Sequence, residues 1–334
     1  MAATEALVLR RGVRLRIWTA AALSLALLLA LVRIFEVGDN QSAQTFALVF
    51  TAIVAEALPF VLVGAFAAAL LEFYVPDRVF NRLARLPVAL QLPAAATGGF
   101  VFPVCECGSV PVARRLIAKG MHPSAGLAFM IASPIFNPIV LGSTWVAYRA
   151  RGLGMEMVLG RAALGLVLSL VAGWAIGTQG ARDLLRPRSD NLDHEHDGAC
   201  DSHRKVFTSH LVEDFFYMGK FLILGAALAA AMQALVPQTL IGGAASSPLI
   251  ASLALMAVAF ISSLCSEADA FVAVSFTPFP IGSQLAFLVF GPVLDLKLFF
   301  LYGATFNRKL LGSLAAVAIP VILAGALWFE VALR

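Results

Sequence analysis

Charged residues are scarce in this chain, and their scarcity excludes an ordinary soluble protein. Of its 334 residues, 13% are charged and 60% are hydrophobic, and the mean hydropathy is +0.88. A soluble domain contains about 25% charged and about 45–50% apolar residues. The composition therefore predicts an integral membrane protein with little room for a soluble domain.

The chain also lacks the motifs of several enzyme classes. Its 4 cysteines form neither a disulfide framework nor the Cys-x-x-Cys pair of a thiol oxidoreductase. Neither a Gly-x-x-x-x-Gly-Lys loop nor a Rossmann glycine pattern is present. We therefore expect no enzyme activity, no bound cofactor and no ATP hydrolysis by this chain. Its net charge of +4 reflects basic residues beside apolar segments and does not indicate nucleic-acid binding.

Long apolar segments predict an all-α polytopic membrane protein with about eight or nine transmembrane helices, since one span needs about 20 apolar residues. No small-residue cleavage site follows the first segment, so we expect an anchor or first span there and not a signal peptide. Proline and glycine interrupt 88–118 too often for one straight helix, so we interpret this segment, and likewise 247–282, as a broken or re-entrant helix. The predicted spans are 17–37, 43–75, 123–147, 155–178, 211–236, 284–303 and 311–332.

Two cysteine-centred segments indicate an internal repeat. Residues 100–109 resemble residues 260–269, and the sequences upstream and downstream of them also match. Repeats with polar and thiol groups at matching points are typical of transporters. We therefore divide the chain into an N-terminal segment with the first span (1–42), repeat 1 (43–178), a polar His/Asp-rich cytoplasmic linker (179–210) and repeat 2 (211–334).

The basic residues predict the orientation of the two repeats. If both ends of each broken segment lie on one side of the membrane, most of the 24 lysines and arginines face the cytoplasm, as the positive-inside bias requires. Each repeat then crosses the membrane three times, and the two repeats are inverted. Inverted repeats form a shared site near the bilayer midplane from interrupted helices. We expect a multi-pass protein of the bacterial inner membrane with a cytoplasmic N-terminus.

Three cysteines in or beside apolar segments are the first candidate substrate ligands. Cys105 and Cys265 occupy equivalent positions in the two copies, and Cys107 lies next to Cys105 in the sequence pattern Cys-x-Cys. Two or three thiolates favour soft species such as Cu(I), Zn(II) or trivalent arsenic. The alternative is three packed cysteines without a ligand, because a free cysteine is often simply buried.

Ionisable residues within apolar segments are the second group of candidates, because a charge inside the membrane is costly and is a functional candidate by default. Glu267 and Asp269 follow the cysteine of the second copy, and Glu106 separates the two cysteines of the first. We predict that these carboxylates couple transport to protons or another cation. The alternative is that charged residues of the spans, such as Asp295 and Lys297, pair and only neutralise one another.

Two further candidates lie at matching helix interruptions. Asn137 lies between two prolines, and Asp295 follows Pro292. Proline frees a backbone carbonyl, so Asn137 and Asp295 either coordinate a cation or hold the broken turn. We include both among the substrate-binding candidates.

The polar linker contains three of the 5 histidines of the chain. His194, His196, Cys200 and His203 form a pattern that could bind a transition metal weakly. The alternative is a disordered, solvated linker between the two halves.

Both copies of the repeat carry motifs with a resemblance to a known family. The motifs are residues 103–111, 127–129 and 133–138 in the first copy and residues 264–271, 285–287 and 291–297 in the second. Together they resemble a family of bacterial predicted permeases, which includes the ArsP-type efflux permeases for trivalent organoarsenicals. The resemblance covers residues 45–330 and implies a polytopic inner-membrane exporter.

The function hypotheses follow from these candidates. The first is a secondary transporter that exports a soft metalloid or metal species, such as trivalent arsenicals, by proton antiport. The second is a membrane protein for thiol exchange, metal delivery or redox assembly that uses Cys105, Cys107 and Cys265. A channel is a third hypothesis. The expected partners are the lipid bilayer and a small inorganic or organometalloid substrate, without nucleic acid, and the sequence leaves a homo-oligomer open.

Overall fold

The structure is a computed structural model that describes residues 41–74, 87–101, 104–177, 184–186, 203–235 and 247–333. Within these ranges the chain is helical and forms no β-strand, which confirms the predicted all-α fold. The first predicted span, 17–37, lies outside the described residues.

Of the described helices, six end before residue 179 and six begin after residue 200. The first half contains α2 (Gln41–Tyr74), α4 (Val88–Val101), α5 (Glu106–Ala118), α6 (Pro123–Ile135), α7 (Pro138–Arg149) and α8 (Gly154–Ile176). The second half contains α10 (His203–Leu235), α11 (Pro248–Ser262), α12 (Asp269–Ala273), α13 (Ile281–Phe290), α14 (Leu296–Thr305) and α15 (Arg308–Ala332). Helix α10 begins inside the segment predicted as the linker.

Five stretches of the described residues are long and apolar enough to cross a membrane. They are Gln41–Ala67, Pro123–Arg149, Gly154–Ile176, Phe215–Ala234 and Lys309–Ala332. The shorter apolar helix α11 lies in the predicted broken segment 247–282, whereas α13 and α14 divide the predicted span 284–303 into two helices at the interruption before Asp295. The membrane character of the fold is therefore confirmed, whereas eight or nine crossings stay a prediction.

The cysteine-centred segments interrupt the helices as predicted. Helix α4 ends at Val101 and α5 begins at Glu106, with Cys105 immediately before it. Helix α11 ends just before Ser263, whose left-handed backbone has a φ of 47°. Left-handed backbone turns the chain sharply and is uncommon outside glycine and asparagine. Both segments are therefore built as breaks, not as continuous spans.

The other two interruptions use the same capping device. The Oδ1 atom of Asn137 accepts a hydrogen bond from the Ile139 amide at 2.9 Å, where α7 begins. The Oδ1 atom of Asp295 accepts one from the Leu298 amide at 2.6 Å, where α14 begins. The first amides of a helix have no partner within it, and Asn and Asp are among the best residues to supply one. Both side chains therefore hold the broken turns.

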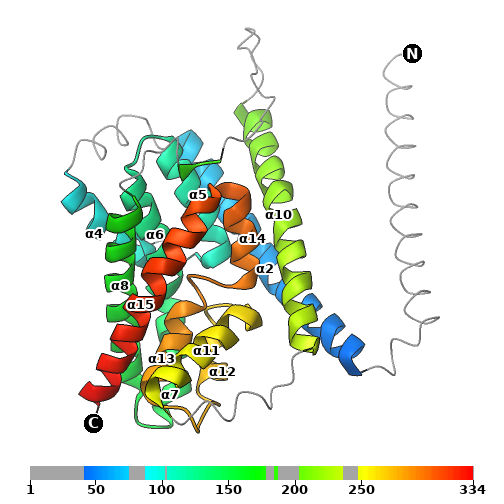
Figure 1. The fold of residues 1–334 in the computed structure, drawn as a ribbon. Coiled ribbons are helices and arrows are strands. Elements are labelled where there is room, and N and C mark those ends of the chain that lie inside the picture. Colours follow the sequence, from blue (N-terminus) through cyan, green and yellow to red (C-terminus); the bar gives the residue numbers. More distant parts are fainter. Residues whose placement is uncertain are drawn as a thin grey trace, which may run out of the picture.

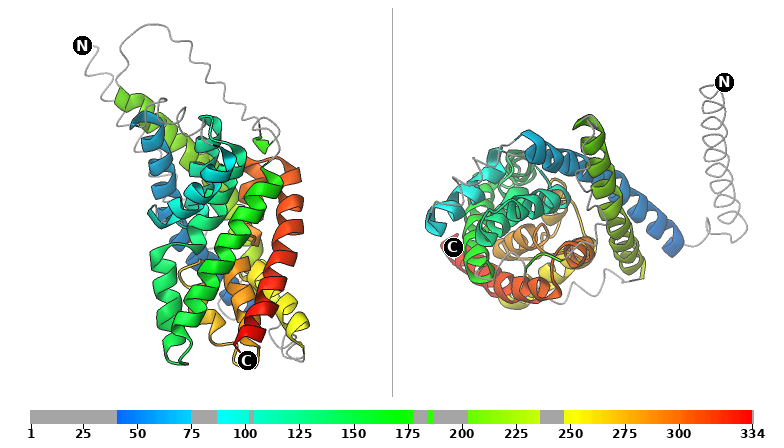
Figure 2. Two further views of the ribbon diagram at one scale, coloured as in Figure 1. Left: turned by 90° about the vertical axis from the view of Figure 1, so that its left-hand side faces the viewer. Right: turned by 90° about the horizontal axis from the view of Figure 1, so that it is seen from above.

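The short helices gather at opposite ends of the molecule. Helices α4 and α5 lie toward one end, and α7, α11 and α12 lie toward the other (Figure 1). Helix α8 packs against α15, and α2 packs against α10, so that two pairs of long helices flank the short ones (Figures 1 and 2). Helices α5 and α14 contact one another, and they pack against α2 and α10, respectively.

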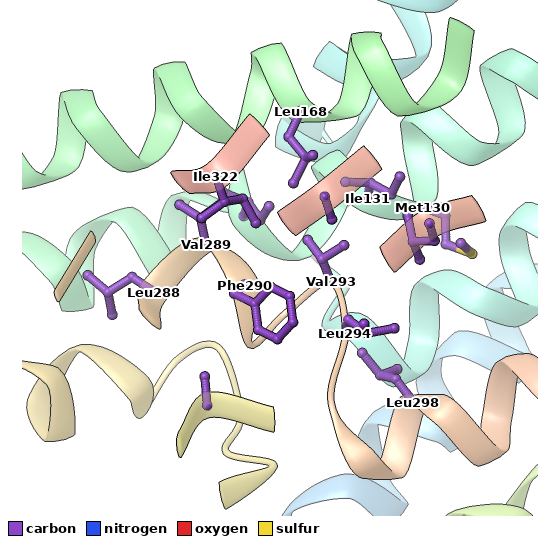
Figure 3. Packing of buried hydrophobic residues seen from close by; sticks show 14 of the residues in the cluster. Met130, Ile131, Leu168, Leu288, Val289, Phe290, Val293, Leu294, Leu298 and Ile322 are labelled. Carbon is purple, nitrogen blue, oxygen red and sulfur yellow. The ribbon is translucent and has the colours of Figure 1, made fainter. Parts of the chain in front are cut away.

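Apolar side chains fill the interior between these helices (Figure 3). Ile131 of α6, Leu168 of α8 and Ile322 of α15 belong to one buried cluster with Val289 and Phe290 of α13. This cluster joins helices from both halves of the chain. The breaks are thus held in a rigid apolar frame, because well-packed interiors resist changes in shape.

Two glycines at matching repeat positions allow the long helices to approach the short ones. A Cβ atom on Gly64 of α2 would overlap the backbone of Gly108 in α5. A Cβ atom on Gly225 of α10 would lie 2.7 Å from the Cα of Lys297 in α14. Only glycine fits such contacts, so each long helix is held against the short helix that carries residues of the candidate site.

Candidate functional site

A small pocket with a free volume of about 10 Å³ lies where the cysteine-centred breaks meet helices α2 and α14. Its lining residues are Ile53, Glu56, Ala57 and Phe60 of α2, then Cys105, Glu106, Cys107, Ser263, Cys265 and Lys297. The three cysteines are buried and free of disulfides. Both halves of the chain therefore contribute thiols and charged groups to one pocket.

Lys297 neutralises charge at the centre of this pocket. Its Nζ atom lies 2.8 Å from Glu106 Oε1 and 3.4 Å from Asp295 Oδ2. The same ammonium donates hydrogen bonds to the carbonyls of Ser263 and Leu264 at 3.1 and 3.2 Å. Lys297, Glu106 and Asp295 are all buried. A buried charge needs such partners, since desolvation without them is expensive.

The second cysteine-centred break turns its side chains toward the first. Ser266 Oγ donates a hydrogen bond to Glu106 Oε2 at 3.0 Å, which joins the two copies of the repeat. The Cys265 thiol donates to Glu267 Oε2 at 2.6 Å. The thiol of Cys265, the carboxylate of Glu267 and the carboxylate of Glu56 lie within 4.8 Å of one another.

A second buried ion pair supports the break from the other side. Arg161 of α8 forms two hydrogen bonds to Asp269, at 2.9 Å to Oδ1 and at 2.6 Å to Oδ2. Its guanidinium also donates to Thr144 Oγ1 at 2.9 Å and to the Ser266 carbonyl at 3.3 Å. The planar guanidinium suits such two-point binding of a carboxylate. Arg161 therefore fixes the position of the turn that carries Cys265.

The sequence that forms this site matches a known protein family. Residues 42–330 match the family model ArsP_1, which is described as "Predicted permease". The chain belongs to this permease family. The match confirms the family that the motifs of both repeat copies resemble.

Two curated proteins are similar to this permease over most of their length. It is 37% identical to the UPF0718 protein YcgR of Bacillus subtilis over 281 residues. This alignment covers 84% of the permease and 95% of YcgR. It is 34% identical over 269 residues to a Streptococcus mutans protein named "Putative two-component membrane permease complex subunit". This alignment covers 78% of the permease and 87% of the relative. No solved structure gives a significant match. The family and the apolar helices together support a multi-pass membrane permease rather than an enzyme.

The structure brings part of the predicted site together in this permease. Cys105, Cys107, Cys265 and Glu106 line the pocket, and Glu267 lies beside it through its contact with Cys265. These residues come from both copies of the repeat, as the equivalent positions of the cysteines suggest.

Other predicted residues lie elsewhere. Asn137 and Asp295 cap helices and are not among the residues that line the pocket. Asp269 binds Arg161 through both carboxylate oxygens. Of the predicted linker ligands, His194, His196 and Cys200 lie outside the described residues. Helix α10 begins at His203, but the side chain of this residue is not described.

Sequence reasoning left four residues out of the candidate site. Glu56 lines the pocket, Lys297 neutralises Glu106, Arg161 binds Asp269, and Ser266 joins the two breaks. Three of them carry a charge within an apolar segment, which is itself a signal of function in a membrane protein. Ser266 carries no comparable signal.

Proposed function

We propose that this permease is a secondary transporter that exports a soft metalloid or metal species, such as a trivalent organoarsenical, in exchange for protons. One observation carries the proposal: three free thiols from both halves of the chain line a single pocket. Thiolates bind soft, thiophilic species, and a mono-organo arsenical accepts two of them. The carboxylates of Glu106 and Glu267 beside these thiols are the proposed coupling groups, and Asp269 acts through Arg161.

The proposal includes two inverted repeats that share this pocket. Its support is the position of the broken segments, since α4 and α5 lie at one end of the molecule and α11 and α12 at the other (Figure 1). The matched caps at Asn137 and Asp295, and the matched glycines Gly64 and Gly225, support it as well. In such transporters, one repeat moves against the other around a fixed site.

Efflux from everted membrane vesicles tests this function. Vesicles that contain the permease should accumulate a trivalent methylarsenical, and a collapsed proton gradient should abolish the accumulation. Cys105→Ser and Cys265→Ser should each lower the rate at least tenfold, because serine keeps the approximate size and removes the soft ligand. Cys200→Ser, in the polar linker sequence, is the matched control and should transport normally. Full activity of the variant that lacks all three pocket thiols would refute the proposed role of the cysteines.

A further inference from the structure

One edge of the pocket contains a donor set that differs from the three thiols. Glu56 of α2 faces Cys265 and Glu267 of the second break, and one ligand atom from each lies within 4.8 Å of the others. The contact of 2.6 Å between Cys265 Sγ and Glu267 Oε2 already holds two of these donors together. We infer that Glu56, Cys265 and Glu267 form a binding site for a divalent metal ion of the zinc class, and this ion is then a substrate of the permease.

The chemistry of the donors favours this class of ion. Trivalent arsenicals prefer thiolates, and hard cations such as Mg²⁺ prefer oxygen donors alone. Zinc binds both cysteine sulfur and carboxylate oxygen, at about 2.3 Å and about 2.0–2.2 Å, respectively. One thiolate and two carboxylates are therefore a zinc-like set, which shares Cys265 with the three pocket thiols but has carboxylates in place of Cys105 and Cys107.

The charges around the pocket favour a cation. Glu56, Glu106, Glu267 and Asp295 are acidic, and Lys297 is the basic residue that faces them within the described part of the chain. Arg161 does not offset them, because Asp269 occupies it. Buried acidic groups need a cation or a proton as partner. Since Lys297 binds Glu106 and Asp295, the carboxylates at the pocket without a basic partner among the described residues are half-buried Glu267 and exposed Glu56.

The exposure of the three donors gives the metal ion a path from the surface to the inferred site. Glu56 is exposed, Glu267 is half-buried and Cys265 is buried, so the donors lead from the surface of the molecule into the pocket. Among the described residues, the carboxylate of Glu56 makes no hydrogen bond or ion pair, so it is free to rotate toward the ion. Three protein ligands leave the fourth position of a tetrahedral zinc ion open. An open position allows release, which a transporter requires and a closed structural site prevents.

Binding of Zn²⁺ to the full chain in lipid nanodiscs tests the site directly. The assay uses a background with His194→Ala, His196→Ala, Cys200→Ser and His203→Ala, because the linker sequence could bind zinc independently. We expect saturable binding of one Zn²⁺ per chain, and no competition from excess Mg²⁺.

Single variants then assign the ligands. Glu56→Gln, Glu267→Gln and Cys265→Ser should each weaken Zn²⁺ binding at least tenfold, whereas Glu156→Gln in the first turn of α8 should leave it unchanged. Glu56→Gln guards against misfolding as an explanation, because this side chain is exposed and holds no other part of the fold. Absence of saturable binding, or binding that survives both glutamate variants, would overturn the inference.

Cobalt(II) gives a spectroscopic readout of the thiol. Co²⁺ bound at this site should show a thiolate-to-metal charge-transfer band, which Cys265→Ser removes and the double variant Cys105→Ser/Cys107→Ser retains. The opposite pattern would place the ion on the first break and refute the site.

The role of zinc as a substrate rests on the proposed function. Transport assays test the metal site and the proposed function separately. Uptake of Zn²⁺ and of the methylarsenical is measured in the same everted vesicles. Arsenical transport without Zn²⁺ binding would refute the metal site alone. Zn²⁺ binding without transport of either species would refute the proposed function and leave the site intact. Zn²⁺ binding with transport of the arsenical alone would refute zinc as a substrate.

Discussion

The ion pair between Lys297 and Glu106 connects the two halves of the site, and its removal has a calculable effect. At an effective dielectric constant of about 20, charges 2.8 Å apart attract each other by about 6 kcal/mol, part of which desolvation offsets. Lys297→Met leaves both Glu106 and Asp295 buried without their cation. Removal of one partner from a buried pair typically costs about 3–5 kcal/mol. We expect this loss for Lys297→Met.

The other half of the pair should be less sensitive. In Glu106→Gln, Lys297 keeps Asp295 and the two backbone carbonyls of the turn at Ser263 and Leu264. The expected loss is therefore about 1–3 kcal/mol, typical of one imperfectly satisfied buried group. The double variant should be more stable than the sum of the two single losses predicts, because it leaves no unpaired charge from this pair.

Thermal unfolding in detergent measures whether Lys297→Met destabilises the protein more than Glu106→Gln. The readout is the fraction of monodisperse protein that remains after heating. At about 2–4 °C per kcal/mol, Lys297→Met should lower the Tm by roughly 6 °C or more. Lys220→Met is the matched control, since Lys220 is a lysine on the exposed face of α10 that packs over Tyr217. If Glu106→Gln lowered the Tm as much as Lys297→Met, or if the two losses were additive, the assigned pairing would be wrong.

Four further predictions follow from the fold. Arg161→Lys should lower the stability by about 1–3 kcal/mol, because lysine keeps the charge but loses the two-point contact with Asp269. An unchanged Tm in thermal unfolding would show that this geometry is unimportant. Gly225→Val should lower the Tm by several degrees and Gly225→Ala by less, because any added side chain meets the backbone of α14, and equal stability of all three proteins would contradict the close approach. Single cysteines introduced at Lys119 and at Thr277 should react with impermeant thiol reagents from the cytoplasmic and periplasmic sides, respectively, and labelling of both from one side would refute the inverted repeats. Asp295→Asn should stay within about 1 kcal/mol of the parent in thermal unfolding and Asp295→Ala should cost more, because asparagine also caps a helix; equal losses would show that the charge matters and not the cap.

Sequence reasoning succeeded where the physical signal is local. The dense proline and glycine of 88–118 predict an interruption because each proline removes a backbone hydrogen bond, and the structure has one between α4 and α5. The repeat of the cysteine-centred motif placed Cys105 and Cys265 at equivalent positions, and both line one pocket. These inferences needed only composition and spacing.

Most partners of the charged residues could not be found in this way, although the sequence offered the pairing of Asp295 with Lys297, whose charged atoms lie 3.4 Å apart. Lys297 and Glu106 are 191 positions apart, and their positions are not equivalent in the repeat. Their contact depends on the packing of α14 against α5, which spacing along the chain does not encode. For the same reason, the sequence marked Asp269 as a coupling group but did not reveal that Arg161, 108 positions away, binds both of its oxygens.

The two halves share a backbone plan but divide the chemistry unequally. Asn137 and Asp295 cap equivalent helices in the same way, yet the residue two positions later is exposed Ile139 in one half and buried Lys297 in the other. The repeat therefore accounts for the breaks and their caps, whereas the charge of the pocket comes from substitutions in one copy. Variants at the Asn137 cap should report on folding. Variants at Lys297, Glu106 and Asp295 should report on folding and transport together, because the ion pairs that fix these side chains also set the charge of the pocket.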